Sequence, residues 1–386
     1  MVNFQYHNPA KIVFGKGSEK ELHRLLQEEK VSSLLMVYSG DFIKELGIYE
    51  AVEEICSTLG VDFHENGSVV PNPSIELVRQ LVEEGKKTGV DFVLAVGGGS
   101  AIDTAKAVAL GILYDGDVWD FFDKGVVPEQ VLPTGVITTL PASGSETSNC
   151  AILSNGQWKL GFEDDRIIPK FAIMNPEYTL GLPAYQTSCG VADILSHLLE
   201  RYFSDVKHTD VTDYLIEGAV QALLVNGERL MNNPKDLDAR AEIQWLASVA
   251  HNNLLDTGRI GDWGSHRIEH ELSAQYGITH GEGMAVVLVA WTKYMAKVKP
   301  WKLAQLAVRV FHVDPYNYSQ EQQAEILSDK LKDYFASLNL KTTLTELEID
   351  SEYFEEMAKR ATRNGPVGHY VPLDAERFQE VLKLAK

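Results

Sequence analysis

The chain has 386 residues, too many for one ordinary domain core, and its 45% hydrophobic and 23% charged residues are typical of a folded globular protein. A formal net charge of -20 argues against nucleic acid and anionic membrane surfaces as partners, because both would be repelled. The longest apolar run, residues 284–291, is far shorter than the ~20 residues that cross a bilayer.

The cysteines and the N-terminus indicate the compartment. Three scattered cysteines, Cys56, Cys150 and Cys189, do not form the even set of a disulfide framework. The N-terminus lacks the basic start, apolar stretch and cleavage site of a signal peptide, so we expect a cytoplasmic protein. No cysteine pair has zinc-finger spacing, and a metal site would therefore need nitrogen and oxygen ligands.

From residue 31 to about 175, short β-branched runs alternate with amphipathic segments. The expected strands are SSLLMVYSG, VDFHENG, VDFVLAVGGGS, TGVITTLPASG and FAIMNPEYT. Apolar residues at three-and-four spacing predict covering helices over 41–60 and 74–89. This alternation predicts βαβ units and a parallel sheet, hence a Rossmann-like α/β domain over residues 1–182.

The pattern changes near Pro183, where the strand-like runs stop. Long helical patterns then continue to the C-terminus, and they predict an all-helical second domain over residues 183–386. The expected helices include residues 191–203, 210–231, 239–255 and 321–338.

A strand, a glycine turn and a helix follow one another in VDFVLAVGGGSAIDTAKAVAL. Glycines let the backbone approach a ligand, and the helix would direct its free N–H groups and positive dipole end at a diphosphate. Ser100 and Asp103 are placed as a near capping box for this helix. The alternative is a tight βα turn without a ligand, since the usual G-x-G-x-x-G fingerprint is absent.

A second polar loop, residues 138–146, follows another expected strand. It would lie at the same carboxyl edge of the sheet, where open α/β sheets bind their ligands. Two such loops favour a nucleotide site.

Five side chains outline a metal site in the second half. Asp193 and His197 are four residues apart and share a helix face, as do His266 and His270. His280 follows a turn at 276–279 that would return the chain toward the first four residues. A carboxylate with two or three imidazoles suits Zn²⁺, Fe²⁺ or a similar ion with one position open for substrate. Spacing alone leaves open which histidine stays off the metal.

The remaining histidines have no motif around them. We expect surface or packing roles for His7, His23, His64, His208, His251 and His312. His369 lies in a Gly/Pro loop that would be able to close over a site.

Four ordered motifs resemble those of the iron-containing (group III) alcohol dehydrogenases, most closely the butanol dehydrogenase-like and aldehyde reductase branch. They are GGGSAIDTAKAVA, TTLPASGSETS, the G-x-A-D-x-x-x-H of residues 190–197, and HRIEHELSAQYGITHGEG. The resemblance covers nearly the whole chain. It implies a dinucleotide-binding domain, a helical metal-bearing domain and a site in the cleft between them.

The resemblance also implies roles for single residues. The implied metal ligands are Asp193, His197, His266 and His280. His270 is implied to approach the nicotinamide without binding the metal. The implied pyrophosphate loop is Gly97, Gly98, Gly99 and Ser100, with Asp103 nearby. The other implied cofactor contacts are Thr138, Thr139, Thr147 and Lys159.

Two positions differ from the family pattern. Relatives often have a small residue where this chain has Glu269, and we expect that side chain to face away from His266 and His270. At the end of the second strand, where the adenosine ribose is implied to lie, NADP-using relatives carry Gly and Ser, whereas this chain has Asp41. A carboxylate there would repel a 2′-phosphate, which favours NAD(H). The neighbouring residues Ser39, Gly40 and Lys44 could still accommodate NADP(H).

The implied function is metal-dependent, NAD(P)-linked interconversion of a small primary alcohol and its aldehyde. The metal would be Fe²⁺ or Zn²⁺, and a homodimer would form through the N-terminal strand IVFGKG. A first alternative is another enzyme of the same fold, like glycerol dehydrogenase or dehydroquinate synthase. The latter would need several cations for a phosphorylated substrate, and near the ligands we find mainly Arg201, Arg259 and Arg267. A second alternative is a non-catalytic nucleotide-binding protein with a closed, structural metal site.

Overall fold

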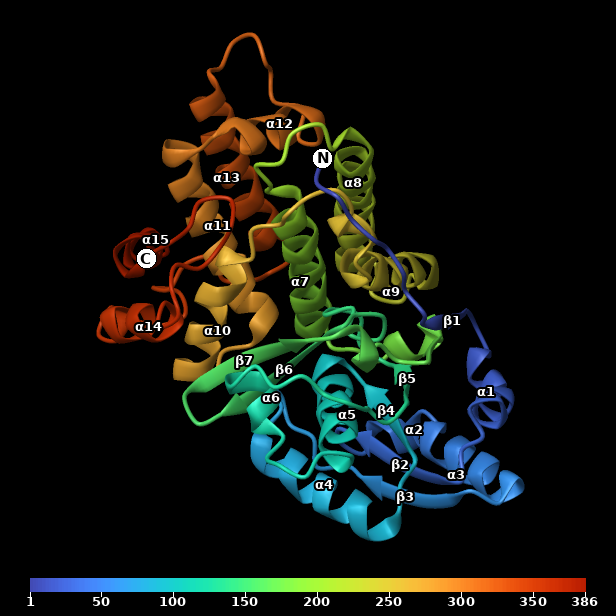
Figure 1. Ribbon diagram of the computed structural model, residues 1–386. Helices are drawn as coiled ribbons and strands as arrows, with labels where there is room; N and C mark the ends of the chain where they lie inside the picture. The colour runs from blue at the N-terminus through green and yellow to red at the C-terminus, as the bar shows by residue number, and fades with distance from the viewer. The chain divides into compact units, whose positions relative to one another are not determined.

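A computed structural model describes residues 1–386 (Figure 1). The chain divides into two compact units, His7–Leu182 and Pro183–Lys386, and Met1–Tyr6 belongs to the second. The first unit contains a parallel sheet with helices and the second contains helices only, which confirms the predicted fold class. The first six residues, grouped with the α/β domain in the sequence-based prediction, lie with the helical unit: the Val2 N–H donates to the Gly258 carbonyl at 3.0 Å.

Six parallel strands form the main sheet of the α/β unit, in the order β1-β8-β5-β4-β2-β3. Their bounds are β1 Lys11–Phe14, β2 Ser33–Tyr38, β3 Asp62–Asn66, β4 Phe92–Gly97, β5 Thr134–Thr138 and β8 Phe171–Met174. Each of the five strands expected between residues 31 and 175 is present. The strand β1 lies at one edge and pairs with β8 alone.

Helices cover both faces of this sheet because successive strand residues point to opposite sides. In β2, Leu35 packs with the core of α4 and α5, whereas Met36 packs with the core of α1 and α3. The helices are α1 Leu22–Glu29, α2 Phe42–Glu45, α3 Ile48–Leu59, α4 Ile75–Thr88, α5 Gly99–Ile112 and α6 Trp119–Asp123. The helix predicted over 41–60 is divided at Gly47, whose φ of 70° is left-handed, into α2 and α3.

A two-stranded antiparallel hairpin, which the sequence did not predict, adds a second small sheet to this unit. Its strands are β6 Cys150–Asn155 and β7 Trp158–Glu163. The hairpin packs against α5 and α6. It therefore carries Lys159 beside the helix that follows the glycine turn.

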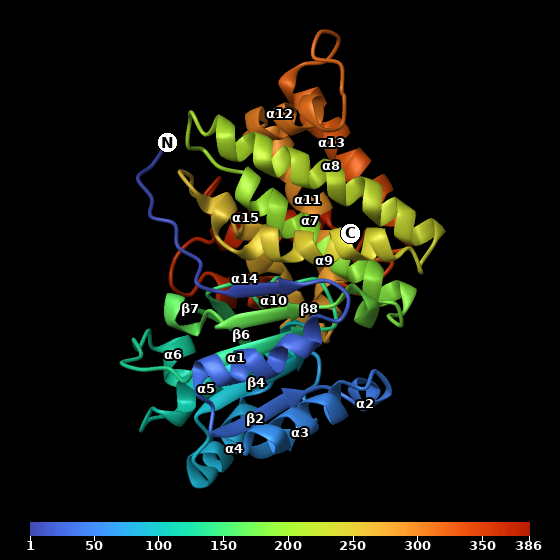
Figure 2. The ribbon, with the colours of Figure 1, turned by 90° about the vertical axis from the view of Figure 1, so that its right-hand side faces the viewer.

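Nine α-helices build the second unit, and α11 is its central helix (Figure 2). Every residue of 284–291 is buried, so this apolar run is the core of the unit, where α7, α10, α13 and α15 pack against it. No helix has the length and apolar character needed to span a membrane. The helices are α7 Ala184–Tyr202, α8 Asp210–Asn232, α9 Leu237–His251, α10 Gly264–Tyr276, α11 His280–Val298, α12 Trp301–Arg309, α13 Gln320–Ser337, α14 Phe354–Ala361 and α15 Ala375–Leu384.

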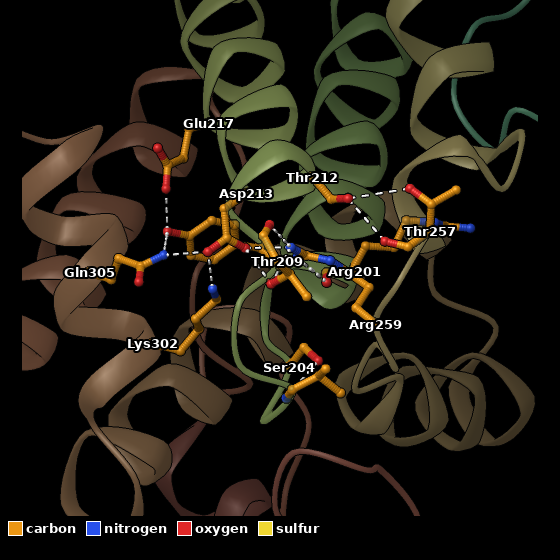
Figure 3. A network of polar contacts seen from close by, with 12 residues as sticks. Arg201, Ser204, Thr209, Thr212, Asp213, Glu217, Thr257, Arg259, Lys302 and Gln305 are labelled. Carbon is orange, nitrogen blue, oxygen red and sulfur yellow. Dashed lines mark hydrogen bonds and ion pairs between the residues drawn. The ribbon is translucent and has the colours of Figure 1, made fainter. Parts of the chain in front are cut away.

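A buried network of charges joins α8 to α12 and to the segment after α9 (Figure 3). The Asp213 carboxylate of α8 accepts hydrogen bonds from the Arg259 guanidinium and the Lys302 ammonium, and one from Gln305 Nε2 at 2.8 Å. All three ionised side chains are at most 5% exposed. Two cations thus surround one carboxylate, an arrangement that offsets the cost of removing each charge from water.

Candidate functional site

The first two side chains of the site come from α7. Asp193 and His197 lie one helical turn apart, both 5% exposed, and His197 Nε2 is 3.9 Å from Asp193 Oδ1. The helix is buried from Thr187 to Tyr202, so a carboxylate and an imidazole here are withdrawn from water. Such groups are costly to bury unless they find a partner.

The next side chains come from α10 and from the first residue of α11. His266 and His270 lie one turn apart, and α10 ends at Gly277, whose φ of +67° closes the helix as expected. The chain then reverses, and His280 Nε2 comes to 3.4 Å from Asp193 Oδ1. The turn therefore returns His280 to the α7 carboxylate, as the sequence predicts.

A glycine allows α7 and α11 to approach closely at this point. A Cβ on Gly281 would lie 2.1 Å from the Cys189 carbonyl oxygen, a contact that no larger residue tolerates. The close approach brings His280 within reach of Asp193. The glycine after His280 in the HGEG sequence is thus explained by helix packing.

The ligand atoms of Asp193, His266 and His280 all lie within 4.8 Å of one another. His197 lies beside this group, with its ring stacked on that of His266 at 4.8 Å between centroids. Buried atoms that make no hydrogen bond include Asp193 Oδ1, His197 Nδ1 and both ring nitrogens of His266. A divalent cation would satisfy these atoms, and one carboxylate with imidazoles is a donor set that Zn²⁺ and Fe²⁺ accept.

Burial determines the charge of these groups. It lowers the pKa of His266 to about 3 and lowers the pKa of His197 well below its ordinary value, so both rings are neutral at pH 7. Burial alone would raise the pKa of Asp193, but the facing imidazoles of His197 and His280 hold this pKa below its ordinary value. The site thus offers an ionised carboxylate and imidazole lone pairs, the forms that bind metals.

A second group of possible ligands overlaps the first: Glu269, His270 and His280 also bring their ligand atoms within 4.8 Å of one another. The expectation that Glu269 faces away from the histidine pair is wrong. Its side chain is fully buried and its Oε2 contacts His280 Nδ1. The physical reason is helix geometry, because residue 269 lies three positions after His266 and so shares its face.

Three further residues lie around the imidazoles: Glu200 and Trp263, which the sequence did not single out, and His251, for which we expected a surface or packing role. Glu200 accepts the His266 backbone N–H at 3.0 Å, and burial raises the pKa of its carboxyl to about 8. The rings of Trp263 and His251 lie 6.1 and 4.5 Å from the His197 ring. Glu200 lay within reach of sequence reasoning, since it is three residues after His197 on the same helix face.

The arginines near the proposed ligands are engaged elsewhere. Arg201 Nε pairs with Asp256 Oδ2 at 2.8 Å and its guanidinium lies over the Trp263 ring. Arg259 pairs with Asp213, and Arg267 is exposed. The cations that a phosphorylated substrate would require are therefore not directed at the imidazole cluster.

In the α/β unit, the strand–glycine–helix element is present as β4, Gly97–Gly98 and α5. The predicted capping box is wrong: Gly98 is the N-cap, without a side-chain cap, and the Asp103 carboxylate instead accepts from Ser145 Oγ at 2.6 Å and Ile152 N–H at 3.1 Å. Asp103 thus joins α5 to the hairpin. Ser100 lies in the first turn of α5, at the positive end of its dipole.

The glycines of this turn have close neighbours from the second polar loop. A Cβ on Gly98 would lie 3.1 Å from Leu140 Cβ, and one on Gly99 would lie 2.6 Å from Ser143 Oγ. The two loops predicted to meet at the carboxyl edge therefore do so, and part of the glycine requirement comes from their contact. The Thr139 N–H donates to the Gly97 carbonyl at 3.0 Å across the same contact.

Polar atoms without hydrogen bonds mark this edge as well. The hydroxyls of Thr138 and Thr139 are buried and unpaired. A nucleotide bound at this edge would supply the hydrogen-bond partners that these hydroxyls lack. Lys159 of β7 and Thr147 are also buried in this unit.

The end of β2 approaches the glycine turn. A Cβ on Gly97 would lie 3.7 Å from Ser39 Oγ, so the strand end and the turn adjoin. Gly40 has a left-handed φ of 68°, and Asp41 follows it with an 85% exposed side chain that pairs with Lys44 at 2.9 Å. Asp41 therefore carries its charge at the surface beside a cation, which reduces its repulsion of a phosphate.

Comparison with known proteins agrees with this arrangement. The sequence model described as iron-containing alcohol dehydrogenase matches residues 9–176, and the one described as Fe-containing alcohol dehydrogenase family, C-terminal, matches residues 187–386. NADH-dependent butanol dehydrogenase A of Clostridium acetobutylicum is 38% identical, with 99% of each chain covered. NADPH-dependent aldehyde reductase YqhD of Escherichia coli is 30% identical, with 98% of each covered.

Solved structures give the same result. The NADH-dependent butanol dehydrogenase A of Thermotoga maritima superposes with a TM-score of 0.95 at 34% identity, covering 99% of this chain and 98% of that one. The matches define an oxidoreductase of the alcohol dehydrogenase and aldehyde reductase class. The chain belongs to the iron-containing alcohol dehydrogenase family.

Proposed function

We propose that this oxidoreductase transfers a hydride between nicotinamide C4 and a small primary alcohol or aldehyde, at a divalent metal held by Asp193, His197, His266 and His280. The convergence of Asp193, His266 and His280, with the unsatisfied buried atoms of Asp193 and His266, carries the proposal. Bound Fe²⁺ or Zn²⁺ would supply a Lewis acid for the substrate oxygen.

His270 is the proposed proton carrier. Oxidation of the alcohol sends a hydride from carbon to the nicotinamide and a proton from the hydroxyl to a base, and reduction reverses both transfers. His270 is buried in the same group as His280, so its ring is close to the proposed metal site. The rings of Trp263 and His251 lie beside that of His197, at 6.1 and 4.5 Å between centroids.

A small, neutral substrate fits the surroundings of the cluster. Arg201 and Arg259 are committed to Asp256 and Asp213, and they are not available to a phosphate or carboxylate. This distribution argues against a dehydroquinate synthase-like reaction, which needs several cations around its substrate.

The proposed cofactor is a nicotinamide dinucleotide, with its pyrophosphate at Gly97–Ser100 and the first turn of α5. The unpaired hydroxyls of Thr138 and Thr139 are the proposed partners of its ribose or nicotinamide, with Thr147 and Lys159 nearby. We favour NADH over NADPH because the 38% identical relative is NADH-dependent, whereas the NADPH-dependent one is 30% identical.

We also propose a cytoplasmic homodimer. Three cysteines scattered along the chain, Cys56, Cys150 and Cys189, are too few and too odd in number for a disulfide framework, a composition that fits a reducing compartment. The open edge of β1 offers main-chain groups to a second copy of the chain.

The function is tested by removing and restoring the metal. The stripped protein is expected to lose NADH-linked reduction of short aldehydes, and added Fe²⁺ or Zn²⁺ to restore it, more with NADH than with NADPH. A panel of aldehydes and alcohols assayed with both cofactors identifies the substrate class. Metal that binds but restores no turnover would instead support a structural metal, and failure to bind metal would refute the proposal.

A further inference from the structure

Glu269 is a fully buried carboxylate in contact with a proposed metal ligand. Its Oε2 contacts His280 Nδ1, and its Oε1 accepts a hydrogen bond from the Ser273 hydroxyl one turn later on α10. Both carboxylate oxygens are therefore engaged by named partners. The other ring nitrogen, His280 Nε2, lies 3.4 Å from Asp193 Oδ1, on the side where the first ligand group converges.

The neighbouring helix leaves space for this carboxylate. A Cβ on Gly283 would lie 2.8 Å from Glu269 Oε1 and 2.9 Å from its Cγ. A side chain at position 283 would therefore force the Glu269 side chain, and that of Ile278 at 2.9 Å, to shift. Glu269 and Gly283 thus act as a pair, one supplying the charge and the other the room for it.

We propose that Glu269 is a positioning residue that holds His280 through Nδ1 and so directs Nε2 at the metal. The proposal rests on the proposed function, because it presumes that Asp193, His266 and His280 bind an ion. A carboxylate that accepts the Nδ1 proton selects the tautomer with its lone pair on Nε2, fixes the ring and makes that nitrogen a better ligand.

The competing role for Glu269 is that of a direct ligand, together with His270 and His280. The contacts favour positioning. A proton shared between Glu269 and His280 Nδ1 occupies the two atoms that this second group would need for a metal, and the Ser273 hydroxyl occupies the other carboxylate oxygen.

The test measures Zn²⁺ affinity of the metal-free protein by competition with a chromogenic chelator. Glu269→Ala is expected to weaken binding about 10- to 100-fold, the usual effect of losing such a partner. Glu269→Gln should lose less, because its amide oxygen still accepts from Nδ1. The matched control is Glu271→Gln, which removes a carboxylate paired with Arg360 Nε at 2.6 Å on the same helix and should leave affinity unchanged.

A second variant tests the space rather than the charge. Gly283→Ala should weaken Zn²⁺ binding in the presence of Glu269 and have no further effect in Glu269→Ala, since the two changes remove one interaction. Gly218→Ala is its control, because a Cβ there meets nothing within 4 Å. If Glu269 and Gly283 had only structural roles, their substitution would lower the stability of the protein and leave the Zn²⁺ affinity of the folded protein unchanged.

Two results would overturn the proposal. Wild-type affinity in folded Glu269→Ala would do so, and if that variant does not fold, wild-type affinity in Gly283→Ala is decisive. A loss as complete as that of His266→Ala, with an altered Co²⁺ absorption spectrum, would make Glu269 a direct ligand. Failure of the unaltered protein to bind Zn²⁺ would refute the proposed function itself, which is a separate outcome.

Discussion

His266 and His270 lie one turn apart on α10, yet their surroundings differ. The His266 ring stacks on His197 and belongs to the group with Asp193, whereas His270 belongs to the group with Glu269. Helix spacing alone treats the two as equivalent. Their neighbours from other elements distinguish them, so their substitutions should have different effects.

His266→Ala should lose both metal and turnover, because it removes a ring whose two nitrogens are buried without hydrogen bonds. His270→Ala should keep the metal and lose about 10²- to 10⁴-fold in kcat, the usual contribution of a general acid–base group. Metal analysis and steady-state rates on the purified variants measure both effects. Equal loss of metal in the two variants would show that His270 is a ligand.

Helix geometry and packing explain why some residues of the site were not predicted from the sequence. Glu269 and Glu200 share helix faces with the predicted ligands, so their spacing contained the signal. The requirement for Gly281 depends on Cys189 of α7, about ninety positions earlier, and no local spacing reveals it. The role of a glycine in helix contact becomes visible only when both helices are placed.

At the scale of elements, the fully buried strands were the most predictable. The strands β2, β4, β5 and β8 are buried along their whole length and are mostly apolar because both of their faces are covered. The hairpin β6–β7 was missed because its short strands mix polar and apolar residues. Its position comes from packing on α5 and from the Asp103 contact with Ile152, which are not local.

The charge network that joins α8 to α12 should contribute to stability. Asp213→Asn leaves Arg259 and Lys302 buried without their carboxylate, and we expect the free energy of unfolding to fall by about 3–5 kcal/mol. Burial alone would raise the pKa of Asp213, but hydrogen bonds from Lys302 and Arg259 hold it below its ordinary value. The stabilisation is therefore full above the unfolded pKa of about 4 and is lost as pH falls through the lower folded value.

Urea unfolding at pH 7 and at successively lower pH measures this effect. The difference in the free energy of unfolding between the unaltered protein and Asp213→Asn should become smaller as the pH falls. The exposed Asp210, also on α8, supplies the control variant Asp210→Asn, which should change stability little. A difference that is independent of pH would show that the charge of Asp213 is not responsible.

At the scale of the whole molecule, the open edge of β1 is the proposed dimer contact. The N–H groups of Lys11 and Gly15 donate to carbonyls on the β8 side, at 3.0 and 2.9 Å. Successive backbone N–H groups of a strand point alternately to its two sides. The N–H of Ile12 therefore points to the open edge, whereas that of Val13 points to β8.

Ile12→Pro should therefore dissociate the dimer while preserving the fold, since it removes only an outward donor. Val13→Pro is the contrasting variant: it breaks the ladder to β8 and should lower stability. Light scattering coupled to size-exclusion chromatography reports the mass of each. If the unaltered protein is monomeric, there is no dimer contact to explain. If the Ile12→Pro variant remains dimeric, the contact does not lie at the open edge of β1.

The most direct test of the central claim is the location of the bound ion. Anomalous diffraction from a crystal of the Zn²⁺- or Fe²⁺-loaded protein should show one peak coordinated by Asp193, His197, His266 and His280, with His270 outside coordination distance. A peak held by Glu269, His270 and His280, or no peak among these side chains, would contradict the account.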